Sequence, residues 1–441
     1  MKVNRKHTII IIITYALLIG ISSMNFLFSE EAAKTKSPVF KLSFIERLRY
    51  EGWDNAVSLN NKIADTRSYT RQRTSIMAQW IPDSDIELAI KFTNEFRYNF
   101  NPKDQTLKMH EIFFDYLYFK WKNIGKTPLS ITVGRQDMLF GEGFVIADGT
   151  PLDGSRSYYF NAVRFDYTLD NSNQLTAFVN YEPATDNILP IIHSSTIPDQ
   201  ALVDRPEMGA GIYYTGKFNK TVIEGYGIHK YEKITDFFPV KNNTETLGVR
   251  VTQSFTPAWS LTAEGAFQFG KVGDNKRKAF GGYAHLDYKF EKTVPFLKTA
   301  TLGGVYLSGD NPSTDTYEGW NPVFSRWPKW SESYIYTLIR ETGVANWTNL
   351  STVYLSLLMP VVDTMTFRLT WHHLMANKFV PGFTMAGTGK TRGDLIIGKL
   401  EFILNKHTTG HVIWEHLNPG NYYFEGANGY NWLRFELMFR F

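Results

Sequence analysis

Cysteine is absent from this 441-residue chain, which excludes disulfide scaffolds and zinc or iron–sulfur sites that need thiolate ligands. Long apolar runs are also lacking: beyond residue 30 no run approaches about 18 residues, which argues against a polytopic helical membrane protein. The formal net charge is only +4 and aromatic residues make up 15%, so disorder is disfavoured as well. The mean hydropathy of −0.26 is that of an ordinary soluble protein. Length alone would therefore favour two or three soluble domains.

The beginning of the chain has the pattern of a signal peptide. A start rich in Lys and Arg precedes Thr8–Ile21, an apolar run of 14 residues that is too short to span a membrane comfortably. We predict a signal peptide over 1–29, a periplasmic N-terminal segment over 30–40, and one further unit over 41–441. An uncleaved membrane anchor is the alternative for the first segment. No cysteine follows the apolar run, so a lipoprotein anchor is excluded.

After residue 40, apolar and polar side chains alternate with the period of two that is typical of β-strands. Ile86, Leu88 and Ile90 share one parity, for example, whereas Glu87 and Lys91 share the other. Helical spacing is not sustained anywhere beyond the leader. The pattern predicts 18 strands, at residues 41–51, 68–80, 85–98, 110–122, 129–137, 158–169, 174–182, 208–217, 220–231, 244–256, 258–269, 279–290, 299–308, 347–359, 363–374, 392–404, 408–416 and 430–441.

The connections between these strands alternate in length. Every second one is short, such as 81–84 or 405–407, and the others are longer, such as 183–207 or 309–346. A bacterial outer-membrane barrel has short periplasmic turns and long external loops, whereas a soluble sandwich has no reason to alternate in this way. Most of the strands are also as long as tilted membrane-spanning strands need to be, about 9–11 residues or more. The sequence therefore predicts an all-β protein, a transmembrane antiparallel β-barrel of about 18 strands in the outer membrane.

The end of the chain supports this prediction. Leu433, Phe435, Leu437, Phe439 and Phe441 share one parity, and the chain ends on the last of them. The stretch is similar to the terminal strand that outer-membrane barrel assembly machinery recognises, so we expect this machinery and outer-membrane lipid as partners. The alternative interpretation is a buried edge strand that happens to end the protein.

The polar parity of the strands carries many charges, which predicts that it lines a water-filled lumen. On the lipid face an Arg or Lys at the membrane midplane would cost about 2–4 kcal/mol. Basic groups modestly outnumber acidic ones, which favours anions as solutes. A structural ladder of Arg and carboxylates that stiffens the wall is an equally weighted alternative for any single residue. The predicted pathway residues on strands include Arg47, Arg49, Arg71, Arg73, Arg97, Arg164, Arg250, Arg368 and Arg434.

The segment 134–157 leaves one predicted strand and passes through several glycines before the next strand begins. It mixes acidic residues with basic ones, so we expect it to fold into the barrel and narrow the pore, with an ordinary external loop as the alternative. The charged residues of this segment that we predict to lie on the substrate pathway are Arg135, Asp137, Glu142, Asp153 and Arg156.

Motifs in and near this segment resemble the alginate export family of outer-membrane barrels. They are Gly-Arg-Gln at 134–136, Asp-Gly-Thr-Pro-Leu-Asp-Gly-Ser-Arg-Ser at 148–157, Asn-Ala-Val-Arg at 161–164, Asp-Asn-Pro at 310–312 and Asn-Pro-Val-Phe-Ser-Arg-Trp at 321–327. The motifs are fairly specific but cover a minor part of the chain. The resemblance implies an 18-strand barrel with an Arg-rich constriction that passes a polyuronate chain. It implies that the constriction or its support consists of Arg135, Asp137, Arg156, Arg164 and Arg326.

Other motifs that imitate chemical sites do not carry an activity. Gly387–Thr391 resembles the end of a phosphate-binding loop but lacks the first glycine and the strand–helix context. His372 and His373 point to opposite faces of a strand and cannot chelate one metal as a pair. We therefore expect no enzyme, no catalytic or metal site, no cofactor and no nucleic acid. The hypothesis is a passive channel for an anionic solute, most directly an alginate-like polysaccharide, with a periplasmic export partner. A small-solute porin, a surface receptor or adhesin, and a barrel enzyme are the alternatives.

Overall fold

The computed structural model of the protein describes residues 38–103, 108–148, 159–193, 202–236, 238–290, 294–325, 330–333 and 347–441. The predicted signal peptide and most of the predicted segment 30–40 lie outside these ranges, so both stay predictions. Among the described residues, no helix is long and apolar enough to cross a membrane.

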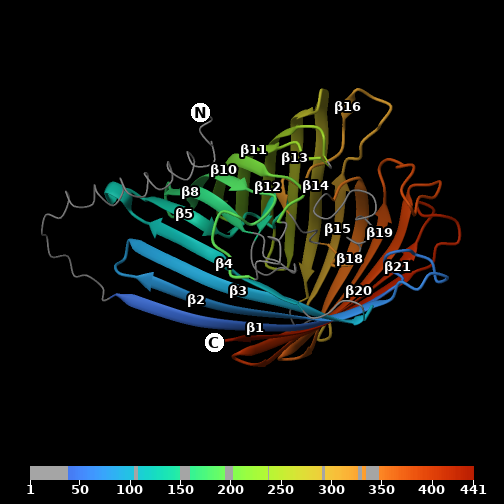
Figure 1. Ribbon diagram of the computed structural model, residues 1–441, viewed down its shortest axis with the longest axis horizontal. Helices are drawn as coiled ribbons and strands as arrows, with labels where there is room; N and C mark the ends of the chain where they lie inside the picture. Colours follow the sequence, from blue (N-terminus) through green and yellow to red (C-terminus); the bar gives the residue numbers. More distant parts are fainter. Residues whose placement is uncertain are drawn as a thin grey trace, which may run out of the picture.

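Eighteen antiparallel strands follow one another around a single closed sheet (Figure 1). The sheet closes where β1 pairs with β22, from Ile45 opposite Arg440 to Asp54 opposite Asn431. The barrel strands are β1 (Val39–Asp54), β2 (Arg67–Ile81), β3 (Ile86–Asn101), β4 (Lys108–Trp121), β5 (Leu129–Gln136), β8 (Phe160–Thr168), β9 (Asn173–Glu182), β10 (Glu207–Phe218), β11 (Thr221–Glu232), β12 (Asn242–Ser254), β13 (Trp259–Val272), β14 (Asn275–Lys289), β15 (Thr299–Leu307), β18 (Leu350–Val362), β19 (Met365–Met375), β20 (Thr391–Asn405), β21 (Thr408–Pro419) and β22 (Tyr430–Arg440).

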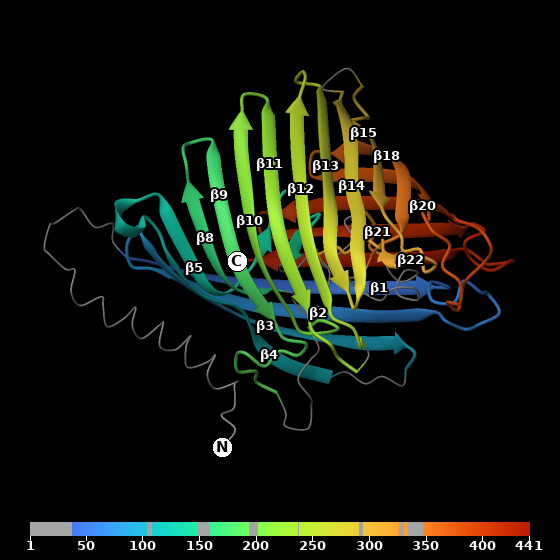
Figure 2. The same ribbon diagram turned by 90° about the horizontal axis from the view of Figure 1, so that it is seen from above.

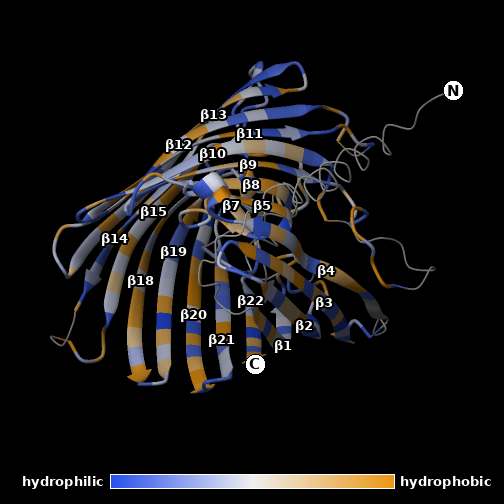
Figure 3. Cartoon of the chain, turned by 90° about the vertical axis from the view of Figure 1, so that its left-hand side faces the viewer, coloured by the Kyte–Doolittle hydropathy of each residue, from blue (hydrophilic) through white to orange (hydrophobic). Residues whose placement is uncertain are grey.

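Each of these strands was expected from the alternation, so the predicted all-β barrel of 18 strands is confirmed. The limits differ by a few residues; β14, for example, begins at Asn275 rather than 279, because its ladder with β13 continues to Val272. The period-two pattern is visible along the strands, where hydrophilic and hydrophobic residues alternate (Figure 3). Outward side chains such as Ile212 and Leu302 are more than half exposed, as expected of a surface that faces lipid.

The short turns of β8 to β15 lie together at one end of the barrel (Figure 2). The turn between β10 and β11 shows the local reason, because only Asn219 and Lys220 connect Phe218 to Thr221. Asn219 has a φ of 55°, and a two-residue hairpin turn requires this left-handed region, which Asn tolerates well. The turn chemistry therefore fixes the register of the hairpin.

The described parts of two long connections contribute side chains to the interior of the barrel. The connection after β5 contains β6 (Met138–Leu139) and β7 (Ile146–Asp148), and the connection after β15 contains β16 (Thr316–Tyr317) and β17 (Phe324–Ser325). β6, β7 and β17 form a separate three-stranded sheet. Around it lies an apolar cluster in which Phe144 stacks on Trp320 at 5.1 Å between ring centroids. The apolar core of this barrel is therefore inside it, between inward loops and the wall.

Candidate functional site

The inner face of β22, β1, β2 and β3 carries rows of basic side chains that face one another across the strands. Arg47 is directly opposite Arg73, and Arg49 is directly opposite Arg71, which in turn is opposite Arg97. Like charges in such positions destabilise a sheet, so this arrangement requires compensation. We call this surface the basic wall; its members are Arg47, Arg49, Arg71, Arg73, Lys91, Arg97 and Arg434.

Four carboxylates at or beside this surface supply that compensation, namely Glu51, Glu95, Asp115 and Glu436, and each lies close to more than one basic group. Glu436, for example, accepts a hydrogen bond of 2.7 Å from Arg49 and lies 3.6 Å from His411. Glu95 lies 3.0 Å from Arg73 and 3.4 Å from Arg47. Asp115 lies 2.8 Å from Lys91 and 3.2 Å from Arg73. The sharing of each carboxylate explains how the opposed Arg rows are tolerated.

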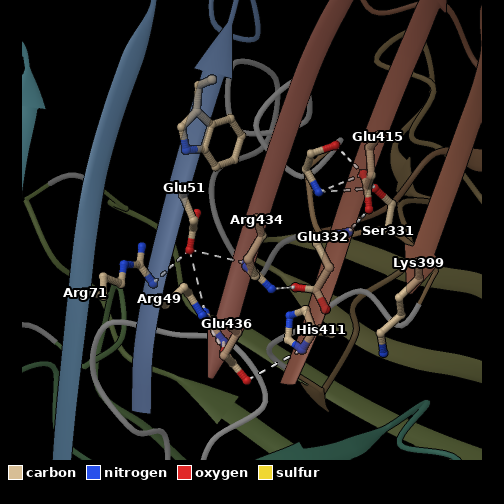
Figure 4. A network of polar contacts seen from close by, with 12 residues as sticks. Arg49, Glu51, Arg71, Ser331, Glu332, Lys399, His411, Glu415, Arg434 and Glu436 are labelled. Carbon is tan, nitrogen blue, oxygen red and sulfur yellow. Dashed lines mark hydrogen bonds and ion pairs between the residues drawn. The ribbon is translucent and has the colours of Figure 1, made fainter. Parts of the chain in front are cut away.

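Glu51 is the most shared of the four carboxylates. Its Oε1 lies 3.4 Å from Arg434 and 3.6 Å from Arg49, while its Oε2 accepts a hydrogen bond of 2.7 Å from Tyr69. Arg71 is a further neighbour, with 3.9 Å between Nη1 and Oε1. These side chains converge from β1, β2 and β22 (Figure 4). The predicted pairs Arg47/Arg49 and Arg71/Arg73 are thus brought together, but within a dense ion-pair network.

The exposure of the basic wall is uneven. Arg47 is fully buried, and Arg49, Arg71 and Arg73 are nearly so. Arg97 is exposed, and its guanidinium stands over the ring of Tyr69 at 4.7 Å. Arg97 is therefore the most accessible cation of these rows.

The inner face of β10 to β14 has the opposite character, and we call it the acidic wall: Glu224, Glu264 and Asp287, with Tyr213, Tyr226 and Tyr283. Glu264 accepts hydrogen bonds from Tyr226 at 2.9 Å and from Tyr283 at 2.8 Å. Arg250 is ion-paired with Glu224 and contacts Tyr283 at 3.3 Å. Neutral hydroxyl donors therefore satisfy most of the carboxylate oxygens here, in place of guanidinium groups.

The inward loop after β5 is fixed to the acidic wall by Glu142. Its Oε1 lies 3.2 Å from Arg250 Nη2 and 3.1 Å from His285 Nε2. The local chain can turn here because Gly141 and Gly143 have φ of 55° and 79°. A side chain at 143 would also meet the Cβ of Ala147 at 2.8 Å. The expected inward folding of 134–157 is thus observed for its described part.

A second loop contact lies on β21 and β22. The buried carboxylate of Glu415 accepts a hydrogen bond of 2.6 Å from the Ser331 hydroxyl and bonds from the backbone N–H groups of Glu332 and Ser333. Glu332 in turn lies 3.1 Å from Arg434. Residues 330–333 are therefore held against the inner wall by two side chains that are far away in sequence (Figure 4).

Arg135, which the resemblance places at the constriction or in its support, occupies a split in the barrel wall. β4 pairs with β5 only from Leu117 to Trp121. At the Leu117 end of this ladder, the Arg135 side chain donates a hydrogen bond of 2.8 Å to the carbonyl oxygen of Phe114. It also makes a two-pronged ion pair with Asp186, at 2.8 and 3.1 Å. Arg135 is 2% exposed, so its geometry is that of a brace.

Of the remaining predicted residues, Arg164, Asp137 and Arg368 are described by the structure and three others are not. Arg164 pairs with Asp166 at 2.8 Å and lies over the ring of Phe140 in the inward loop. Asp137 accepts a hydrogen bond from Tyr116. Arg368 is partly exposed and stands opposite Lys399 on the neighbouring strand. The residues that lie outside the described part of the chain are Asp153, Arg156 and Arg326.

Sequence reasoning missed Asp186 and Ser331, because both lie in long connections with no periodic signal. Glu51, Glu264 and Glu415 belong to the polar parity of the predicted strands, but their partners could not be predicted, since the pairing depends on register. His372 and His373 do point to opposite faces: the first is buried, and the second pairs with Asp394 at 3.0 Å. In the part of the chain that the structure describes, no three His, Asp or Glu residues are grouped as metal ligands would be.

The comparisons with known proteins agree with this geometry. The family model described as alginate export matches residues 40–379, which is most of the chain. This chain belongs to the alginate export family. The predicted family resemblance is thereby confirmed. No curated protein matches the chain in sequence.

Solved outer-membrane proteins of Pseudomonas aeruginosa share the fold of this family member. OpdK with vanillate is 12% identical, with a TM-score of 0.58 over 91% of this chain and 98% of that chain. OccK2 (OpdF) in complex with glucuronate is 13% identical, with a TM-score of 0.56 over 91% and 97%. OccD3 (OpdP) is 10% identical, with a TM-score of 0.55 over 93% of each. The chain is an outer-membrane β-barrel of the porin fold, as the sequence predicted.

Proposed function

We propose that this barrel is a passive channel for anionic solutes, and that its substrates are carboxylate-bearing carbohydrates of the uronate class. The observation that carries the proposal is the concentration of Arg on the basic wall, whose buried rows end at the exposed Arg97. Three opposed Arg pairs destabilise the sheet: Arg47 with Arg73, Arg49 with Arg71, and Arg71 with Arg97. A role in bracing alone does not require this cost. Arg is the side chain best suited to bind carboxylates through two hydrogen bonds.

The charges that remain accessible support the same class of solute. Arg97 is exposed, and Arg368 and Lys399 form an opposed cationic pair that is partly exposed on another part of the inner face. Glu401 partly neutralises Lys399, at 2.7 Å. A cationic surface of this kind raises the local concentration of anions and lowers that of cations. Family membership adds weight to a uronate polymer as the solute.

Reversal potentials across planar bilayers test the charge preference. The refolded full chain in a KCl gradient is expected to prefer chloride, and the double variant Arg97→Ser/Arg368→Ser is expected to lose part of that preference. Lys278→Ser is a control for the loss of a positive charge outside the lumen, because Lys278 lies on the outward parity opposite Phe269; the single variants Arg97→Ser and Arg368→Ser are compared with it one charge at a time. A cation preference of the unmodified chain, or no conductance, would contradict the proposal.

A small-solute porin is the second candidate, and the inward loops favour it. β6, β7 and β17 occupy part of the interior, and residues 330–333 are fixed to another part of the wall. Two barrels of the same fold are solved with small carboxylates, vanillate and glucuronate. Blockade of the ion current distinguishes the candidates. Long blockades by oligouronates support a polymer channel, whereas blockade by glucuronate alone supports a small-solute porin.

A further inference from the structure

The tip of the β13–β14 hairpin carries three lysines on its outward face. Lys271 of β13 is directly opposite Lys276 of β14, and Lys278 is opposite Phe269, one outward position closer to the middle of the barrel. All three lysine side chains are exposed, and on β14 they alternate with Arg277, which is buried on the inner face. We call Lys271, Lys276 and Lys278 the outer lysine group.

The outer lysine group lies at the external interface of the membrane. β13 ends at the same end of the barrel as the long connections 183–206 and 308–349, and long connections are external in outer-membrane barrels. At the opposite end, the exposed Trp259 of β13 contacts Tyr288 of β14, with 4.6 Å between ring centroids. Ten residues separate Trp259 from Phe269, which for a tilted strand corresponds to about 25 Å, the height of the apolar band. The three lysines are therefore at the level of the lipid head groups or just outside it.

Exposed aromatic side chains lie beside the outer lysine group, on the membrane side of it. Phe267 and Phe269 of β13 are stacked, with 6.3 Å between ring centroids. Phe280 of β14 is directly opposite Phe267, and its ring lies 6.0 Å from that of Tyr306 on β15. All four side chains are exposed. This outward face therefore presents apolar rings at the depth of acyl chains and three cations at the depth of head groups.

The chain itself does not neutralise the outer lysine group. Like charges directly opposite each other destabilise a sheet, yet none of the three ammonium groups is ion-paired with a described residue. Outward histidines near the external end of other strands do have an acceptor in the chain: His229 pairs with Glu245 at 2.6 Å, and His373 pairs with Asp394 at 3.0 Å. The outer lysine group thus differs from them, and an anion from outside the chain would remove its internal repulsion.

We infer that the outer lysine group binds the phosphate groups of lipopolysaccharide, the phosphorylated lipid of the external leaflet. Because the barrel lies in the outer membrane, lipid is what surrounds its outward face. A phosphate group carries about −1.5 to −2 charges near neutral pH, so one phosphate between Lys271 and Lys276 offsets both ammonium groups. Lys is a common phosphate ligand, and basic clusters at membrane surfaces bind anionic head groups. The neighbouring aromatic rings contact the acyl chains of the same lipid. This inference is independent of the solute that the channel passes.

Binding of purified lipopolysaccharide to the refolded full chain in detergent tests the site. The triple variant Lys271→Ser/Lys276→Ser/Lys278→Ser is expected to bind about 100-fold more weakly, since each lysine at a charged lipid surface changes the affinity about fivefold. Lys220→Ser/Lys298→Ser/Lys406→Ser is the matched control, because it removes three positive charges from exposed positions in the turns at the opposite end of the barrel. Equal affinities of the two triple variants, or no binding by the unmodified chain, would overturn the inference.

Three comparisons show whether the site recognises the phosphate groups of a lipid. Lys271→Arg/Lys276→Arg/Lys278→Arg keeps the charge and should bind as the unmodified chain does. Lipopolysaccharide without its phosphate groups should bind the unmodified chain as weakly as the intact lipid binds the triple serine variant. An equal concentration of inorganic phosphate should not displace the lipid, because it lacks the acyl chains. Resistance to unfolding in SDS without heating verifies that each variant has formed the barrel. Undiminished binding of the dephosphorylated lipid, or displacement by inorganic phosphate, would contradict the assignment.

Discussion

The basic wall and the acidic wall occupy the same parity of the same barrel, yet they satisfy their charges in different ways. On the basic wall, a few carboxylates are shared among many guanidinium groups, and Glu51 alone lies within 4 Å of three Arg side chains. On the acidic wall, Glu264 accepts from two tyrosine hydroxyls, and its nearest Arg nitrogen is 4.0 Å away. One wall depends on charge balance and the other on neutral hydrogen bonds.

The difference extends to what each wall contacts. Tyr213 and Tyr283 of the acidic wall pack against Phe140 and Phe144 of the inward loop, at 4.7 and 5.4 Å between ring centroids. The tyrosine rings thus pack against the inward loop, and the tyrosine hydroxyl groups donate hydrogen bonds to the carboxylates. Beside the basic wall, Trp53 and Trp432 provide an aromatic contact at 5.4 Å between ring centroids, and Arg434 pairs with Glu332 of the inward segment at 330–333. Inward segments therefore pack on both walls, against tyrosine rings on one and beside ion pairs and tryptophan rings on the other.

The largest expected effect is on the basic wall. Glu51→Gln removes the charge that three Arg side chains share in a buried site, and it is expected to lower the free energy of unfolding by about 3–5 kcal/mol. Urea unfolding of the refolded barrel in lipid vesicles, followed by tryptophan fluorescence, measures the change. A loss below about 1 kcal/mol would show that the basic wall does not depend on shared charge.

A smaller loss is expected on the acidic wall. Glu264→Gln keeps one acceptor oxygen for the two tyrosine hydroxyls, so the expected loss is about 1–3 kcal/mol by the same measurement. Tyr226→Phe is the companion variant; it removes one hydrogen bond from a neutral donor to a carboxylate and should cost about 1.5–3 kcal/mol. The comparison between the walls fails if Glu264→Gln destabilises the barrel as much as Glu51→Gln does.

The sequence was sufficient to predict the strands of the barrel wall but not the side-chain contacts inside the barrel. Alternation fixed which side of each strand Arg49 and Arg71 occupy, since a slip of one residue would send every side chain to the other face. Their direct opposition was not predictable, because it depends on the register between β1 and β2. The family motifs drew attention to Arg135, but only the structure shows that β4 and β5 separate beside it.

The inward contacts were the least predictable part. Glu415 and Ser331 are 84 residues apart, and a loop without periodicity carries no signal for its partner. Glu142 was included because its loop is dense in charge and glycine, yet its partners Arg250 and His285 come from two different strands. Long-range polar pairs of this kind are set by where the loops pack, and the packing follows from aromatic residues such as Phe144 and Trp320.

The smallest expected effect is at the accessible pair of Lys399 and Glu401, and it sharpens the comparison between buried and accessible charge. Both side chains are at least 32% exposed, so water screens their attraction, and Glu401→Gln should change the free energy of unfolding by no more than about 1 kcal/mol. The same variant removes the anion nearest to the cationic pair of Lys399 and Arg368. It is therefore expected to raise the preference for chloride in a KCl gradient while stability stays almost constant. A large loss of stability without a change in reversal potential would place this pair with the buried network and remove it from the conduction pathway.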